Sequence, residues 1–191
     1  MNLPNILTSI RIAVSLTVPF LMFMDNFWVR VIAGIVCALA IATDWFDGWY
    51  ARKYNQVSTT GKILDPIADK VYIIITYSVL AFLGMFSIWW VIPIFIREIV
   101  ITVYRFIFLH LGKAVAAVQS GKVKTVIQIG SIGLIFCSFM GKTYYFGYYP
   151  FWLQAVVYLS LFASIILTMY SGYVFFQNNW KLIKSYHNLA S

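Results

Sequence analysis

Long runs of mainly apolar residues, separated by short polar segments, constrain the fold of this chain more than any other feature. A helix needs about 20 such residues to cross a bilayer, and the runs lack the alternation that a membrane β-barrel requires. Of the 191 residues, 62% are hydrophobic and 10% are charged, which is more apolar surface than one soluble core can bury. The sequence therefore predicts an all-α polytopic membrane protein with six transmembrane helices. The predicted spans are residues 9–24, 28–51, 63–84, 88–110, 122–140 and 150–176.

The segments that connect these spans are too short to form a second domain, so we expect one membrane domain over residues 1–191. Before the first span, Asn2–Ser9 mixes polar residues with leucine and isoleucine around Pro4. This pattern predicts a short helix that lies in the membrane interface and leads into the first span.

Basic residues near the span ends are distributed unevenly between the two sides of the predicted membrane domain. One side has only Arg30 and Lys142. The positive-inside rule places the richer side, and with it both termini, in the cytoplasm. The net charge of +8 is spread over the span ends, which favours anionic lipid headgroups as partners and argues against nucleic acid. The richer side holds Arg11, Arg52, Lys53, Lys62, Lys113, Lys122, Lys124, Lys181 and Lys184.

Four of the six acidic residues, Asp44, Asp47, Asp65 and Asp69, fall within 26 residues that are flanked by apolar sequence. A charged side chain at membrane depth costs roughly 2.5 to 3.5 kcal/mol, so such a cluster needs a compensating cation or a chemical role. Each pair is spaced to share one helix face, and two antiparallel helices can bring the pairs together. Carboxylates suit Mg²⁺, and two such ions promote displacement at phosphorus. The aspartates are therefore predicted metal ligands for phosphoryl chemistry.

Small and basic residues accompany the aspartates. Gly48, Ala51 and Gly61 would let a phosphate-bearing ligand approach the backbone, and the planar guanidinium of Arg52 suits a pair of phosphate oxygens. Plain helix packing also explains the small residues, and the positive-inside rule also explains Arg52. An ion or proton pathway is the competing interpretation of the aspartates.

The pattern D-x2-D-G-x2-A-R-x8-G-x3-D-x3-D is present between Asp44 and Asp69 at all eight fixed positions. It resembles the signature of the CDP-alcohol phosphotransferases. The similarity to one branch of that family, the phosphatidylglycerophosphate synthases, extends over further segments. These are Asn2–Thr8 with Arg11, Arg97–Ile99 with Arg105, and Gly121–Thr125 with Gln128.

The resemblance implies six transmembrane helices, a homodimer and a site for two Mg²⁺ ions, or Mn²⁺, that opens to the cytoplasm. It also implies a reaction in which an alcohol attacks the β-phosphorus of a CDP-linked lipid and CMP leaves. By the same resemblance Asp44, Asp47 and Asp65 are metal ligands, and Asp69 is the catalytic base that also touches a metal. The CDP group would be held by Asp44, Asp47, Gly48, Ala51, Arg52 and Gly61.

Basic residues in the fourth and fifth spans are candidates for binding the acceptor. Arg97 and Arg105 are eight residues apart, about 12 Å along one helix face, and Lys122 and Lys124 begin the next span. Such a pocket suits a phosphorylated acceptor such as glycerol 3-phosphate. We expect one arginine to pair with Glu98 or an aspartate, and a structural ion pair or a cytoplasmic collar of basic residues stays open as the alternative.

The expected function is transfer of a phosphatidyl group from CDP-diacylglycerol to glycerol 3-phosphate in a bacterial inner membrane, with the active site facing the cytoplasm. Inositol phosphate or serine as acceptor is the nearest alternative. A divalent-cation transporter is the alternative from a different class, although it would need carboxylates near the middle of the bilayer and a path to both sides.

Overall fold

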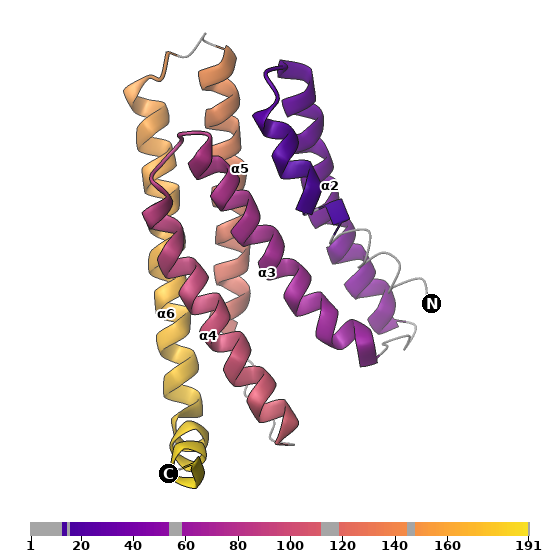
Figure 1. Cartoon of the computed structure of the whole chain (residues 1–191), viewed down its shortest axis with the longest axis vertical. Coiled ribbons are helices and arrows are strands. Elements are labelled where there is room, and N and C mark those ends of the chain that lie inside the picture. The colour runs from indigo at the N-terminus through magenta and orange to yellow at the C-terminus, as the bar shows by residue number, and fades with distance from the viewer. Residues whose placement is uncertain (1–12, 15, 54–58, 112–118, 145–147, 191) are drawn as a thin grey trace.

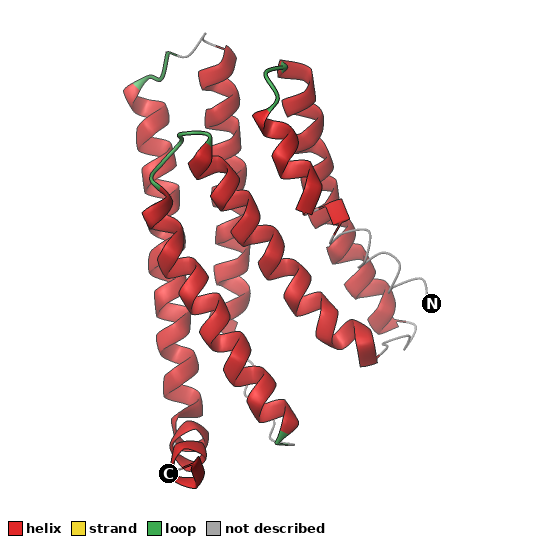
Figure 2. Cartoon of the chain, viewed as in Figure 1, coloured by secondary structure: helices red, strands yellow, loops and turns green. Residues whose placement is uncertain are grey.

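The computed structural model describes residues 13–14, 16–53, 59–111, 119–144 and 148–190, and it describes no side chains for 41–53, 59–69, 109–110, 119–120, 181 and 185–190. All regular structure in the described part of the chain is helical (Figure 2). The all-α prediction is therefore confirmed for these residues. The elements are η1 (Val18–Phe23), α2 (Phe27–Lys53), α3 (Thr59–Phe82), η2 (Ile88–Trp90), α4 (Val91–His110), α5 (Gln119–Tyr144) and α6 (Phe151–Ala190).

The last five predicted spans each coincide with one of the helices α2 to α6. In the first predicted span, residues 18–23 instead form the 3-10 helix η1, where Pro19 removes a backbone donor near the start. Helix α6 continues to Ala190, well beyond its apolar part, because hydropathy marks the part of a helix that suits lipid and not the end of the helix. The predicted interfacial helix Asn2–Ser9 lies outside the described residues.

Many large apolar side chains of the described helices face outward, and several polar side chains are buried inside. Trp28 and Leu159 are each 71% exposed, whereas Ser164 and Thr168 are 0% exposed. This arrangement suits a helix bundle in lipid, where polar groups must find partners within the protein. Two described segments are long and apolar enough to cross a bilayer, Gly121–Tyr144 and Phe151–Trp180, and the parts of α2 and α3 with described side chains, Phe27–Ala40 and Lys70–Phe82, are also apolar. These helices are consistent with a membrane protein, and six spans stay a prediction.

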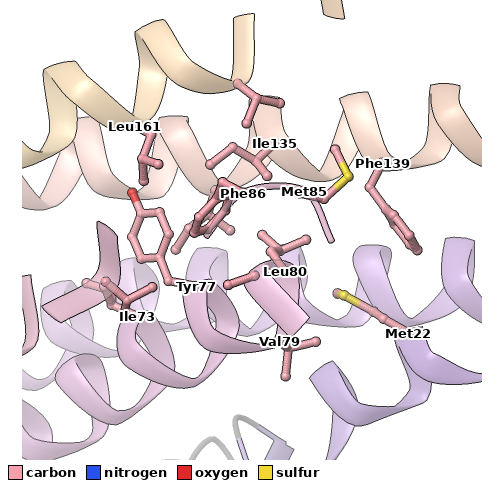
Figure 3. Close-up of a cluster of buried hydrophobic side chains, with 14 of the residues drawn as sticks. Met22, Ile73, Tyr77, Val79, Leu80, Met85, Phe86, Ile135, Phe139 and Leu161 are labelled. Atoms are coloured by element: carbon pink, nitrogen blue, oxygen red, sulfur yellow. The ribbon is translucent and has the colours of Figure 1, made fainter. Parts of the chain in front are cut away.

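Helices α5 and α6 pack along one another, α4 packs on α6, and α3 packs on both α4 and α5 (Figure 1). Helix α2 packs on η1 and α5. Side chains from η1, α3, α5 and α6 meet in a buried cluster that includes Met22, Tyr77, Leu80, Ile135 and Leu161 (Figure 3). This core fixes α3 against the α5–α6 pair.

The turn after α3 reverses the chain so that α4 runs back through the bundle. Gly84 has φ +74°, a left-handed conformation that glycine adopts without strain. The N–H of Gly84 donates to the carbonyl of Ala81 at 2.9 Å, and the N–H of Met85 donates to that of Leu80 at 3.2 Å. These bonds close the helix end and bury Met85 and Phe86 in the core. The end of α2, the start of α3 and the end of α4 consequently lie in the lower half of Figure 1.

Candidate active site

The four aspartates of the acidic motif lie on two consecutive helices, Asp44 and Asp47 on α2 and Asp65 and Asp69 on α3. At 1.5 Å per residue, Asp47 lies about 9 Å before the end of α2 and Asp65 about 9 Å after the start of α3, while Asp44 and Asp69 lie about 14 and 15 Å from those ends. Only residues 54–58 separate the two helices, so their ends are at most about 22 Å apart. The two pairs therefore lie at similar distances from the facing ends of two consecutive helices.

The donor chemistry of this motif fits a divalent metal. Residues three and four apart on an α-helix share a face, so each helix presents two carboxylates on one face of its backbone. Carboxylate oxygens are the hard donors that Mg²⁺ prefers. Among the side chains that the structure describes, no group of three or more His, Cys, Asp or Glu residues gathers. The motif stays the candidate metal site. The side chains of its aspartates, of Ala51 and of Arg52, and the surroundings of Gly48 and Gly61, lie outside the described set.

A buried ion cluster on α4 and α5 forms the described part of the site. The Glu98 carboxylate is 2% exposed and pairs with two cations. Its neighbour Arg97 donates from Nη1 to Oε2 at 3.2 Å, and Lys124 on α5 donates from Nζ to Oε1. The pairing of Arg97 with Glu98 confirms the expectation that one arginine of α4 has an acidic partner.

Two further contacts extend this cluster to α3 and α6. Lys70, the residue after Asp69, donates from Nζ to the hydroxyl of Thr102 on α4. Arg97 donates from Nη2 to the hydroxyl of Ser171 on α6 at 2.7 Å. The cluster thus ties four helices together, and it reaches the helix that carries Asp65 and Asp69.

Among the described residues of this cluster, two buried cations share one carboxylate. Glu98 faces Arg97 and Lys124 directly. The charges of Lys70 and Arg97 both act on Lys124. Because buried charges are stable only when they are paired, the second cation favours an anion as the ligand of this region.

The remaining predicted acceptor residues lie around the buried cluster. Arg105 is exposed on α4, with its guanidinium 5.8 Å from the ring centroid of Phe175, and its charge acts on Arg97. Lys122 is exposed near the start of α5. Lys124 is 4% exposed, and its contact with Glu98 accounts for one of its three donors. The structure therefore brings Arg97 and Lys124 together and leaves Arg105 and Lys122 on the surface.

Polar side chains continue from the cluster into the core and fix α5 against its neighbours. Gln128, one turn after Lys124, donates from Nε2 to the hydroxyl of Thr168 at 3.0 Å. The hydroxyl of Tyr77 on α3 lies 2.9 Å from that of Ser164. Because these contacts are buried and join α3, α5 and α6, they hold these three helices in register with one another.

Lys70, Thr102 and Ser171 were not among the site residues predicted from the sequence. A signal existed for Lys70, since a lysine that directly follows the last aspartate and opens an apolar segment is unusual. Thr102 and Ser171 carry no such signal, because serine and threonine are common in membrane helices as ordinary packing residues.

Comparison with known proteins identifies relatives of this chain. Residues 1–175 match the family model for CDP-alcohol phosphatidyltransferase. A Bacillus subtilis protein named CDP-diacylglycerol--glycerol-3-phosphate 3-phosphatidyltransferase is 32% identical, over 96% of this chain and 98% of its own. A protein of the same name from Yersinia enterocolitica is 30% identical over 95% of this chain and 96% of its own. Another from Salmonella choleraesuis is 36% identical over 67% of this chain and 72% of its own. The similarity therefore covers both the acidic motif and the ion cluster.

Proposed function

The chain belongs to the CDP-alcohol phosphatidyltransferase family, and from this premise we propose how its residues carry out the reaction of its relatives. The enzyme transfers a phosphatidyl group from CDP-diacylglycerol to glycerol 3-phosphate, and it releases phosphatidylglycerophosphate and CMP. The observation that carries this function is the match to relatives of that name over nearly the full length of both chains. It is an enzyme of anionic phospholipid biosynthesis.

The acidic motif supplies the first half of the mechanism. Asp44, Asp47, Asp65 and Asp69 would hold two Mg²⁺ ions, or Mn²⁺, which when bound neutralise charge on the pyrophosphate of the lipid nucleotide. Gly48, Ala51, Arg52 and Gly61 hold the CDP group, on the same stretches of α2 and α3 as the aspartates. These roles rest on the family motif and on the similar distances of the two aspartate pairs from the facing ends of α2 and α3.

Asp69 acts as the general base. It accepts the proton of the acceptor hydroxyl while that oxygen forms a bond to the β-phosphorus of CDP-diacylglycerol. The bond from this phosphorus to the CMP oxygen breaks, and CMP leaves with the electron pair. Lys70, which follows Asp69, contacts α4, so the base and the basic cluster lie on helices in direct contact.

The acceptor phosphate is bound by Arg97, Arg105, Lys122 and Lys124. Among the described residues, Arg97 and Lys124 share the single carboxylate of Glu98, which supports this assignment because a phosphate would compensate the second cation. A neutral or zwitterionic acceptor would leave the second cation uncompensated. The cluster therefore favours glycerol 3-phosphate over serine.

The decisive test is CMP release by the detergent-purified protein with CDP-diacylglycerol and Mg²⁺. Glycerol 3-phosphate, inositol phosphate, serine or no acceptor is added in parallel. We expect release with glycerol 3-phosphate only, and none after the metal is chelated. Release with another acceptor would overturn the assignment of the basic residues. If no acceptor gives release, metal uptake into sealed vesicles tests the transporter alternative.

The enzyme is a homodimer of the bacterial inner membrane, with both termini and the active site on the cytoplasmic side and with anionic lipids around its basic span ends. The basic residues near those ends support this orientation. Labelling with a membrane-impermeant thiol reagent from the periplasmic side tests it. A Lys142→Cys variant should react and a Lys122→Cys variant should not, and chemical crosslinking in membranes tests the dimer.

A further inference from the structure

A polar contact crosses from α3 to α4 directly beside the residue that acts as base. Lys70 donates from Nζ to Oγ1 of Thr102. The same hydroxyl donates to the carbonyl of Glu98 in its own helix at 2.5 Å. The hydrogen bond to Glu98 therefore holds the Thr102 hydroxyl in a fixed orientation while it accepts the hydrogen bond from Lys70. Since consecutive Cα atoms are 3.8 Å apart, anchoring Lys70 also anchors the backbone of Asp69.

The depth of Lys70 makes the contact more than a surface interaction. Lys70 lies about 16 Å along α3 from Thr59, and it opens the apolar segment Lys70–Phe82. A cation is unfavourable at such a position unless a polar group receives it. Thr102 offers that group on α4, which packs against α3.

Helix α4 is itself fixed by the rest of the cluster. Glu98 holds Lys124 of α5, and Arg97 holds Ser171 of α6. These contacts lie within one or two turns of Thr102 along α4. The Lys70–Thr102 hydrogen bond consequently joins the helix of the base to the residues assigned to the acceptor phosphate.

We propose that Lys70 is a positioning residue, which through Thr102 sets the place of the Asp69-bearing turn of α3 relative to the acceptor-binding cations on α4 and α5. This inference rests on the proposed function, because it gives Lys70 a task only if Asp69 must meet an acceptor hydroxyl. A misplacement of about 1 Å between reacting groups lowers a rate by as much as about 100-fold. One hydrogen bond between helices is able to control a displacement of that size.

Two substitutions that keep side-chain size test the proposal, Lys70→Met and Thr102→Val. Each is expected to lower kcat about 10- to 100-fold while the KM values for glycerol 3-phosphate and CDP-diacylglycerol stay within about twofold, because binding groups are intact. The double variant should be no slower than the slower single variant, since both remove the same contact. Thr102→Ser keeps the hydroxyl and should retain most of the activity.

Ser78→Ala is the matched control. The Ser78 hydroxyl is also part-buried and lies on α3, but it donates to the carbonyl of Ile74 in its own helix at 2.8 Å. We expect its kcat to equal that of the unmodified enzyme. Turnover is expressed per CDP-binding site, so that loss of folded protein is separated from loss of rate.

Three results would overturn the proposal while the unmodified enzyme still releases CMP. Additive losses in the double variant would show that the two residues act independently. A raised KM for glycerol 3-phosphate with unchanged kcat would place Lys70 among the phosphate ligands. Fewer CDP sites with normal turnover per site would leave Lys70 a purely structural role. Failure of the unmodified enzyme to release CMP would instead reject the proposed function.

Discussion

Two arginines at opposite ends of the bundle sit in polar surroundings that differ in one respect. Near the start of α2, Arg30 uses all three guanidinium nitrogens. It donates to the carbonyl of Met22 at 3.1 Å, to the hydroxyl of Thr143 at 3.5 Å and to the carboxylate of Asp25 at 3.3 Å. The group also lies 5.2 Å from the ring centroid of Phe139. Arg30 is therefore a clamp that holds η1 against α2 and α5.

On α4, Arg97 lies in a cluster that is less completely satisfied. Nη1 and Nη2 have partners in Glu98 and Ser171, but Nε is buried without a partner among the described residues. Arg30 faces one exposed carboxylate, whereas Arg97 shares a buried carboxylate with Lys124. Among the described residues, the buried carboxylate of Glu98 therefore pairs with two cations, and the exposed carboxylate of Asp25 pairs with one. A buried carboxylate shared by two cations separates the proposed ligand site from the structural clamp, and matched substitutions at the two ends test this distinction.

The largest difference between the ends is expected for aspartate substitutions. Asp69→Asn removes the proposed general base and should lower kcat about 10²- to 10⁴-fold. Asp25→Asn makes the same chemical change at the Arg30 end. Its side chain is fully exposed, and an exposed ion pair contributes about 0 to 1 kcal/mol, so CMP release should match that of the unmodified enzyme. CMP release with both substrates in excess measures the effect.

An Asp69→Asn enzyme of normal rate would reject the assignment of the base. A large loss of activity in Asp25→Asn would show that the Arg30 end also takes part in the reaction, and the comparison would fail. Size-exclusion profiles of both variants establish that each is folded.

The second largest effect is expected on stability, at Glu98. Glu98→Gln leaves Arg97 and Lys124 buried without their carboxylate. Removal of one partner from a buried pair destabilises a protein by about 3 to 5 kcal/mol. At the Arg30 end, Asp25→Asn should lower stability by at most about 1 kcal/mol. Denaturant unfolding in detergent micelles compares the two variants, and equal stabilities would contradict the buried cluster.

The contrast between the two ends also explains what the sequence could predict. Spacing within one helix was enough for the acidic motif, because residues three or four apart share a face whatever the helix packs against. The structure places both aspartate pairs on helices, α2 and α3, as expected. The pairing of Arg97 with Glu98 was likewise accessible, since the two residues are adjacent and both are charged.

Contacts between helices were not accessible in the same way. The Lys70–Thr102 and Arg97–Ser171 contacts depend on how each helix is rotated about its own axis. Helix α6 is apolar over most of its surface, and its few small polar residues give only a weak signal for that rotation. The sharing of Glu98 by two cations appears only once those rotations are known.

Substitutions of Arg105 on α4 and of Arg30 on α2 are expected to have opposite effects on kinetics and on stability. Arg105→Gln removes a proposed charged donor to the acceptor phosphate, and such a hydrogen bond is worth about 1.5 to 3 kcal/mol. It should lower kcat/KM for glycerol 3-phosphate about 10- to 100-fold with unchanged stability and unchanged KM for CDP-diacylglycerol. Arg30→Gln should do the reverse and lower stability by about 1 to 3 kcal/mol with unchanged KM values. Steady-state kinetics and unfolding curves on both variants decide the outcome.

A loss of stability in Arg105→Gln with intact kinetics would make Arg105 a second clamp, against its exposure. Higher KM values in Arg30→Gln would mean that the acceptor site reaches the Arg30 end of the bundle. The separation of the two clusters along α5 argues against this outcome.

The smallest difference is expected between Lys122 and Lys142, which lie near opposite ends of α5. Lys122 is exposed, so solvent screens its attraction to a phosphate. Lys122→Ala should raise the KM for glycerol 3-phosphate only about two- to fivefold, in line with less than about 1 kcal/mol for an exposed ion pair. Lys142 lies 5.4 Å from the ring centroid of Tyr149 at the Arg30 end, and Lys142→Ala should leave this KM unchanged.

Salt separates these two lysines more sharply than a single KM value does. At low ionic strength the Debye length grows to about 30 Å, so the effect of Lys122→Ala should increase as salt is removed, while Lys142→Ala stays at the reference value. A salt series of KM for glycerol 3-phosphate measures this. Equal salt dependence in both variants would mean that Lys122 acts through the overall positive charge of the protein. A difference confined to Lys122 would place the attraction at the end of α5 where Arg97 and Lys124 share Glu98.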